Sequence, residues 1–176
     1  MRDMMNWTEF VIKPGLTLLS GAITGLIVAF FTARYALARF YKEKWWEKKL
    51  TAFLEVTEYI YKIKRAEDYW FAQAESMQYQ DETFQALSKE EEEDLRSEYV
   101  KGMKELTRIS HLSSFTLSKK ASQVLGGYIV EHDRIYPSWW QDEIDSFEAS
   151  ERSQVLINTL LESILVEAKR ELKLKG

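Results

Sequence analysis

Side chains that commonly carry catalysis are few in this chain, and one pair comes near a known arrangement. The sequence holds two histidines, His111 and His132, and no cysteine. Arg108 stands three positions before His111. Helical nucleases that cut RNA with an Arg–His pair place the Arg at least a full helical turn before the His. Arg108 and His111 are therefore the candidate catalytic residues, but their spacing is too short for that chemistry.

Other signatures of enzymes and bound ions are missing from the sequence. It has no G-x-S-x-G motif, no phosphate-binding glycine loop and no H-E-x-x-H motif. Without cysteine it has no disulfides or thiolate metal sites, which fits a reducing compartment. Its net charge of −4 differs from the basic balance typical of nucleic-acid-binding proteins. We therefore expect no enzyme activity, no cofactor, no metal and no direct nucleic-acid binding.

A different kind of signal lies in residues 14–33, PGLTLLSGAITGLIVAFFTA, which contain no ionisable side chain. A helix of about this length crosses the roughly 30 Å hydrocarbon core of a bilayer. Because it also contains several Ser, Thr and Gly residues, this span is better accommodated against other helices than alone in lipid. A buried core helix and a signal peptide cleaved after Ala38 stay open as alternatives, although the charges of Arg34 and Arg39 argue against cleavage.

Small residues recur in this span at helical spacing. Gly21-x-x-x-Gly25, extended by Ala29, is a face that lets helices approach closely. A neighbouring, weakly polar face would serve as a helix interface in a dimer, or would line a water-filled path in a ring of chains. One span cannot form a channel alone. The candidate residues for packing or for a pore are Thr17, Gly21, Thr24, Gly25 and Val28.

Basic residues follow the span directly and predict its orientation. Residues 34–50 carry six Lys or Arg residues, whereas residues 1–13 carry two. Since basic flanks stay cytoplasmic, we expect the N-terminus outside and the rest of the chain inside. The candidate residues at the cytosolic mouth are Arg34, Arg39, Lys42 and Lys44, and ordinary contact with anionic lipid explains the same residues equally well.

Apolar residues at helical spacing and a scarcity of Gly and Pro predict an all-α fold. We divide the chain into a short extracytoplasmic N-terminus (1–13), a transmembrane helix (14–33) and a cytosolic domain (34–176). The first helix should continue without a break to about Gln78, so that the cytosolic domain is a bundle of about four helices. Its inward stripe is predicted as Trp46, Leu50, Phe53, Thr57, Ile60 and Lys64, widened by Leu54 and Tyr61.

The later helices have recognisable start and stop signals. Ser88 and Glu91 form a capping-box pattern before a second helix that should end near Ser110. Ser118 is the expected N-cap of a third helix over 119–133, with a possible break at its two adjacent glycines and a stop at Pro137. A last helix is predicted over 149–172, and its inward stripe is Val155, Leu156, Thr159, Leu160, Ser163, Ile164 and Ala168.

Together these features resemble a known family. They are one N-terminal span, no cysteine, the aromatic and basic exit RFYKEKWWEKKL (residues 39–50), and a helical domain with the short Arg108–His111 spacing. In this combination the chain looks like the small membrane-anchored accessory protein of type VI-B CRISPR systems, which accompanies an RNA-guided RNase and to which a divergent HEPN motif has been attributed.

The resemblance implies an oligomeric pore that depolarises the bacterial inner membrane when the RNA-guided RNase detects phage transcripts. The partners would be copies of the same chain, arranged as a ring, and the lipid bilayer. Two other functions stay open. One is a single-span tether that holds a partner at the membrane, and the other is a membrane-anchored HEPN-like RNase.

Overall fold

The computed structural model describes the backbone of residues 7–173 and the side chains of residues 21–173 except Ser114. Over this range the chain is all-α, with four helices and no strand. Its two compact units divide between Trp45 and Trp46. The helices are α1 (Trp7–Tyr79), α2 (Lys89–Thr116), α3 (Lys119–Trp140) and α4 (Ser146–Leu172). The predicted all-α class, with a long apolar N-terminal helix before a helical bundle, is confirmed.

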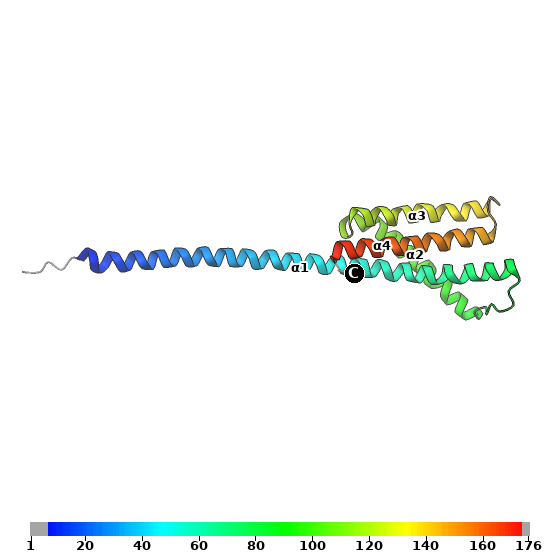
Figure 1. The fold of residues 1–176 in the computed structure, drawn as a ribbon, viewed down its shortest axis with the longest axis horizontal. Coiled ribbons are helices and arrows are strands. Elements are labelled where there is room, and N and C mark those ends of the chain that lie inside the picture. The colour runs from blue at the N-terminus through cyan, green and yellow to red at the C-terminus, as the bar shows by residue number, and fades with distance from the viewer. Residues whose placement is uncertain (1–6, 174–176) are drawn as a thin grey trace, which may run out of the picture. The chain divides into compact units, whose positions relative to one another are not determined.

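The second unit is a bundle around one apolar core. In Figure 1, α3 and α4 run side by side, and both contribute to this core together with α2 and the later part of α1. Side chains from all four helices are fully buried in it, which is the arrangement that amphipathic helices adopt to remove their apolar stripes from water. These are Val56, Ile60, Ile63, Leu106, Leu125, Ile157 and Ile164.

The structure corrects two of the predicted stripes. In α1, Phe53 and Ile60 are buried as expected, but Leu54 and Tyr61 are more than 60% exposed. The buried stripe runs instead through Val56 and Ile63, because the face that meets the other helices is rotated toward these positions. In α4 the prediction holds at Leu160 and Ile164, whereas Val155 and Thr159 are exposed and Ile157 is buried in their place.

Two helix starts are capped as predicted. The Ser88 side chain accepts from the backbone N–H of Glu91 while the Glu91 carboxylate accepts from the backbone N–H of Ser88, which is the complete capping box of α2. The Ser118 side chain accepts from Ala121 N at the start of α3. Such caps satisfy backbone donors that have no partner within the helix.

Helix α2 runs further than predicted, to Thr116 rather than Ser110. The serine-rich segment stays helical because its polar side chains find partners there. The fully buried Ser113 donates its hydroxyl to Ser110 O and also contacts the Ser122 hydroxyl of α3. These bonds matter because Ser113 is fully buried, and a buried hydroxyl without a hydrogen-bond partner would destabilise the bundle.

Helix α3 also passes both expected interruptions. It continues through Gly126 and Gly127 and includes Pro137 before ending at Trp140. A proline so close to the C-terminus removes one backbone donor, while its own carbonyl still accepts from Gln141 N at 2.9 Å. The prediction that Pro137 ends the helix was therefore wrong, and the region before α4 is a short turn.

Candidate functional site

The first candidate site is the apolar part of α1, which from Gly21 onward buries none of its side chains within the chain. Among the described residues, α1 supplies one helix, from Gly21 onward, that is long and apolar enough to cross a membrane. The buried share of its most apolar stretch is 0%, whereas the core helix of a soluble protein would be mostly buried. Its large exposed apolar side chains include Ile23, Leu26, Ile27, Val28, Phe30 and Phe31. An exposed apolar surface of this extent requires a covering environment.

Two of the small residues predicted to form a packing face, Gly21 and Gly25, lie on this helix with open space around them. A Cβ atom added to Gly21 or Gly25 would meet no atom within 4 Å. Thr24 and Val28 are exposed, and the side chain of Thr17 lies outside the described residues. Because a glycine within a helix exposes its backbone, another helix could approach this face closely.

The residues predicted for the cytosolic mouth are all exposed on α1. Arg39 Nε lies 3.5 Å from the Glu43 carboxylate one turn on, and an exposed pair of this kind contributes about 0.3–0.5 kcal/mol. Arg34, Lys42 and Lys44 complete the set. Their placement just after the apolar segment keeps them suited to a membrane interface.

The structure does not bring Arg108 and His111 into a catalytic arrangement. Both lie on α2, and both are exposed. The Arg108 guanidinium is engaged by two carboxylates, at 2.6 Å from Glu105 Oε2 and 3.3 Å from Glu55 Oε1. These contacts hold Arg108 as a surface ion-pair residue joining α2 to α1.

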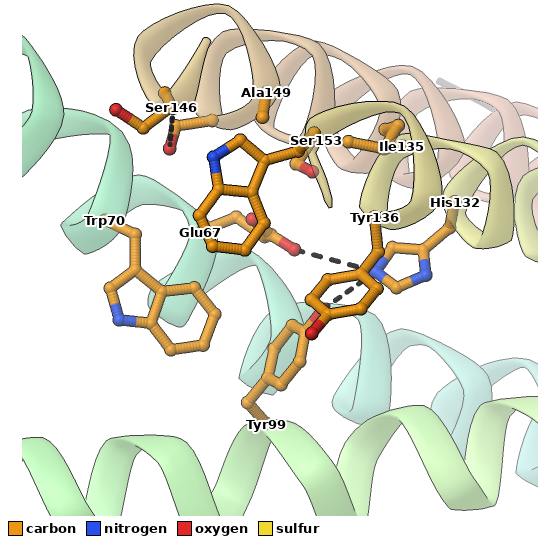
Figure 2. A pocket seen from close by; sticks show the side chains of 11 residues that line it. Glu67, Trp70, Tyr99, His132, Ile135, Tyr136, Ser146, Ala149 and Ser153 are labelled. Atoms are coloured by element: carbon orange, nitrogen blue, oxygen red, sulfur yellow. Dashed lines mark hydrogen bonds and ion pairs between the residues drawn. The ribbon is translucent and has the colours of Figure 1, made fainter. Parts of the chain in front are cut away.

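The second candidate site is a solvent-open cavity of about 300 Å³ on the bundle, and sequence reasoning missed it. It is lined from all four helices, and Figure 2 shows the side chains that converge on it. At its base is Glu67 of α1, which is only 4% exposed. Glu67 Oε1 lies 3.9 Å from Nε2 of His132 on α3, and the same Nε2 atom lies 2.7 Å from the Tyr99 hydroxyl of α2.

Burial shifts the proton equilibria of this polar cluster. Burial raises the pKa of Glu67 to about 7, against a hydrogen bond from Tyr99 that lowers it. Burial also lowers the pKa of His132, although the Asp133 carboxylate acts in the opposite direction. The pKa of Tyr99 is raised, first by burial and then by the nearby Glu67 charge. Near neutral pH the cluster therefore holds a neutral imidazole and a carboxyl group close to its midpoint.

Aromatic rings form much of the remaining wall. Trp70 packs edge-on against Tyr99 with ring centroids 4.8 Å apart, and Tyr136 lies 5.8 Å from Trp139. Helix α4 supplies a polar edge of Ser146, Ser150 and Ser153. No Lys or Arg is present among the described residues that line the cavity. The arrangement can hold a small ligand against a buried carboxyl group.

The sequence carries only a faint signal for this cavity. Glu67 stands in the segment KRAED (64–68), where a charged residue on a solvated face is the ordinary expectation. Only its position one turn after the buried Ile63 marks it as inward-facing. His132 has no metal-ligand partner nearby in the sequence, and no group of three metal-ligating side chains occurs in the part of the chain that the structure describes.

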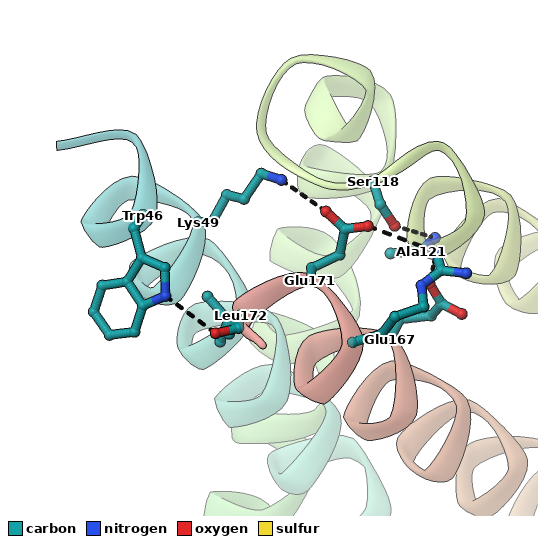
Figure 3. Close-up of polar contacts among 8 residues, drawn as sticks. Trp46, Lys49, Ser118, Ala121, Glu167, Glu171 and Leu172 are labelled. Atoms are coloured by element: carbon teal, nitrogen blue, oxygen red, sulfur yellow. Dashed lines mark hydrogen bonds and ion pairs between the residues drawn. The ribbon is translucent and has the colours of Figure 1, made fainter. Parts of the chain in front are cut away.

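A second polar cluster closes the bundle where α4 ends, as Figure 3 shows. Trp46 Nε1 donates to Leu172 O at 3.3 Å, and Lys49 Nζ lies 2.7 Å from Glu171 Oε2. The buried Glu167 pairs with Lys120 of α3 at 3.2 Å and with Arg170. Because each acid here has a basic partner, this cluster fastens helices together rather than presenting a binding site.

Comparisons with protein-family models, curated proteins and solved structures found no match to this chain. Its functional assignment therefore depends on the two sites described above, the exposed apolar segment of α1 and the cavity around Glu67.

Proposed function

We propose that this chain is a single-span membrane protein that assembles with copies of itself into a pore or another membrane-perturbing structure. The observation that carries the proposal is the apolar segment of α1, whose large side chains find no cover within the chain. A bilayer covers such a surface, and the open face at Gly21 and Gly25 suits close contact with a second copy.

The proposal includes an orientation and a setting. Basic residues after the span favour an external N-terminus and a cytoplasmic helical domain. The resemblance of the exit segment 39–50 and of the overall organisation to the type VI-B CRISPR accessory family supports a role at the bacterial inner membrane. There the assembly would depolarise the membrane during phage infection, alongside an RNA-guided RNase.

Substitution of the small-residue face tests this proposal. Gly25→Leu places a bulky side chain where helices would meet, so we expect it to abolish depolarisation measured with a potential-sensitive dye in infected cells. The matched control is Ile27→Phe, which enlarges a side chain about 200° around the same helix and should leave depolarisation intact. Membrane fractionation checks that both variants are inserted. Full depolarisation by a chain with bulky residues at both Gly21 and Gly25 would exclude the packing model.

A tether without a pore is the second candidate, and one feature of the helical domain favours it. Near the end of α3, Tyr136 and Trp140 are 62% and 71% exposed, and their rings stack 6.4 Å apart. Exposed aromatic side chains are enriched at protein interfaces. A tether predicts that function survives replacement of residues 14–33 by an unrelated membrane span, whereas the pore predicts that this replacement abolishes depolarisation.

A further inference from the structure

We propose that the cavity around Glu67 binds a small organic ammonium ion, with the Glu67 carboxylate as its counter-ion and the neighbouring aromatic rings as its walls. This site belongs to the compact unit Trp46–Gly176, whereas the apolar segment of α1 belongs to the other unit. The proposal does not depend on whether the chain forms a pore.

The charge of the cavity selects a cation. Glu67 is the only residue with a carboxyl side chain among the described residues that line the cavity, and no Lys or Arg lines it. His132 contributes a neutral imidazole near neutral pH, because burial lowers its pKa. A buried carboxylate without a cationic partner is costly, so a ligand that brings a positive charge gains from this arrangement while an anion would be repelled.

The aromatic walls select an organic cation over a hydrated metal ion. Trp70, Tyr136 and Trp139 all line the same cavity as Glu67. Ring faces attract an ammonium group within about 6 Å of their centroids, most strongly when it is desolvated. The volume of about 300 Å³ accommodates a ligand with an apolar body as well as a charged head. Metal ions would require several oxygen ligands, and among the described residues that line the cavity Glu67 alone supplies a carboxylate.

The serine edge gives the ammonium group further acceptors. A primary ammonium ion has three N–H donors, of which the Glu67 carboxylate can accept one or two. Ser146, Ser150 and Ser153 line the cavity from α4. The Ser150 hydroxyl donates its hydrogen to Ser146 O at 2.9 Å, so its oxygen still has lone pairs with which to accept.

Binding should depend on pH through Glu67, since a cation binds its ionised form. The titratable groups that interact with Glu67 are Asp68 on α1, Tyr99 on α2, and Tyr128 and His132 on α3, and Asp133 lies beside His132. Helix α4 presents serines to the cavity. With a pKa of about 7, the ionised fraction of Glu67 rises from about a tenth at pH 6 to about nine tenths at pH 8. Affinity should therefore increase about tenfold over that interval.

Isothermal titration of the full chain in a neutral detergent tests the proposal with three probes of one shape. These are 2-phenylethylammonium, the neutral 2-phenylethanol and the anionic phenylacetate, each corrected by a titration into detergent alone. We expect the ammonium probe to bind, with the neutral and anionic probes at least tenfold weaker, and the affinity to rise from pH 6 to pH 8.

Matched variants locate the site. Glu67→Gln should weaken binding of the ammonium probe at least tenfold at pH 8. Glu162→Gln, the same change at an exposed position, should leave the affinity unchanged. Trp139→Leu removes one ring at a partly exposed position, so it should weaken binding about threefold or more without unfolding the chain. The proposal is overturned if the ammonium probe does not bind at millimolar concentration, if the neutral probe binds as tightly, or if Trp139→Leu and Glu67→Gln both leave its affinity unchanged.

Discussion

Replacing Glu67 by Gln should stabilise the protein, and increasingly so as pH rises. The pKa of Glu67 is raised from 4.5 to about 7 by burial in the folded chain. Between these two values the unfolded chain has released its proton while the folded chain still holds it. The stability that Glu67 contributes is therefore complete below pH 4.5 and is lost as pH rises to about 7.

The size of this loss follows from the two pKa values. Each pH unit between the two pKa values lowers the free energy of unfolding by about 1.4 kcal/mol. Ionisation of Glu67 therefore lowers it by about 2.5 kcal/mol between pH 5 and pH 8. Gln has the same shape and does not ionise. For a helical unit of this size the difference corresponds to about 8 °C in Tm. The contribution of His132 has the opposite sign, and it cancels when the two proteins are compared because both contain it.

Thermal unfolding of the full chain in detergent, followed by circular dichroism at pH 5 and pH 8, measures this difference. We expect the Tm advantage of Glu67→Gln over the unsubstituted chain to grow by about 8 °C from pH 5 to pH 8. The exposed control Glu162→Gln should show no such growth. An advantage that stays constant within about 2 °C, or that shrinks toward pH 8, would refute the reasoning that burial keeps Glu67 protonated.

Other substitutions test the packing and the site assignments. Gly102→Val should destabilise the bundle by about 1–3 kcal/mol in urea unfolding, because even a Cβ at Gly102 would lie 3.1 Å from Ile63 Cγ1. Gly127→Ala should instead stabilise it by about 0.5–1 kcal/mol, since a Cβ there meets nothing within 4 Å; destabilisation would show that α3 is constrained at this point. Ser88→Ala should cost about 1 kcal/mol through loss of the capping box, and an unchanged midpoint would mean that the start of α2 frays. His111→Ala should leave membrane depolarisation unchanged because His111 is exposed on α2. Loss of depolarisation in this variant would favour the RNase alternative.

Local signals were sufficient to predict the all-α class and the starts of α2 and α3, whereas α4 begins at Ser146, three residues before its predicted start. The capping box depends on Ser88 and Glu91 alone, and the cap at Ser118 depends on the residues that directly follow it. Both were predicted correctly, since each involves groups within one helical turn. The end of α3 was not, because the local rule that a proline stops a helix takes no account of tertiary packing, which here offsets the one backbone hydrogen bond that Pro137 loses.

The cavity was beyond sequence reasoning for a different reason. Glu67, Tyr99 and His132 stand on three helices, and their meeting depends on the rotation of each helix in the bundle. The predicted stripe of α1 was displaced toward Leu54 and Tyr61, which are exposed. A rotation error of that size places Glu67 on the solvated face. Gly102 was missed similarly, because its contact with α1 has no counterpart in the local sequence.

The most direct test of the central claim, a self-assembled membrane protein, is the protein mass of the detergent-solubilised complex by size exclusion with light scattering. Each chain contributes 20.8 kDa, so the copy number follows from the mass once detergent is subtracted. The account predicts a discrete species of roughly six or more chains, enough spans to surround a water-filled path. A monomer or dimer that persists in several mild detergents would contradict the pore and leave the tether as the better explanation.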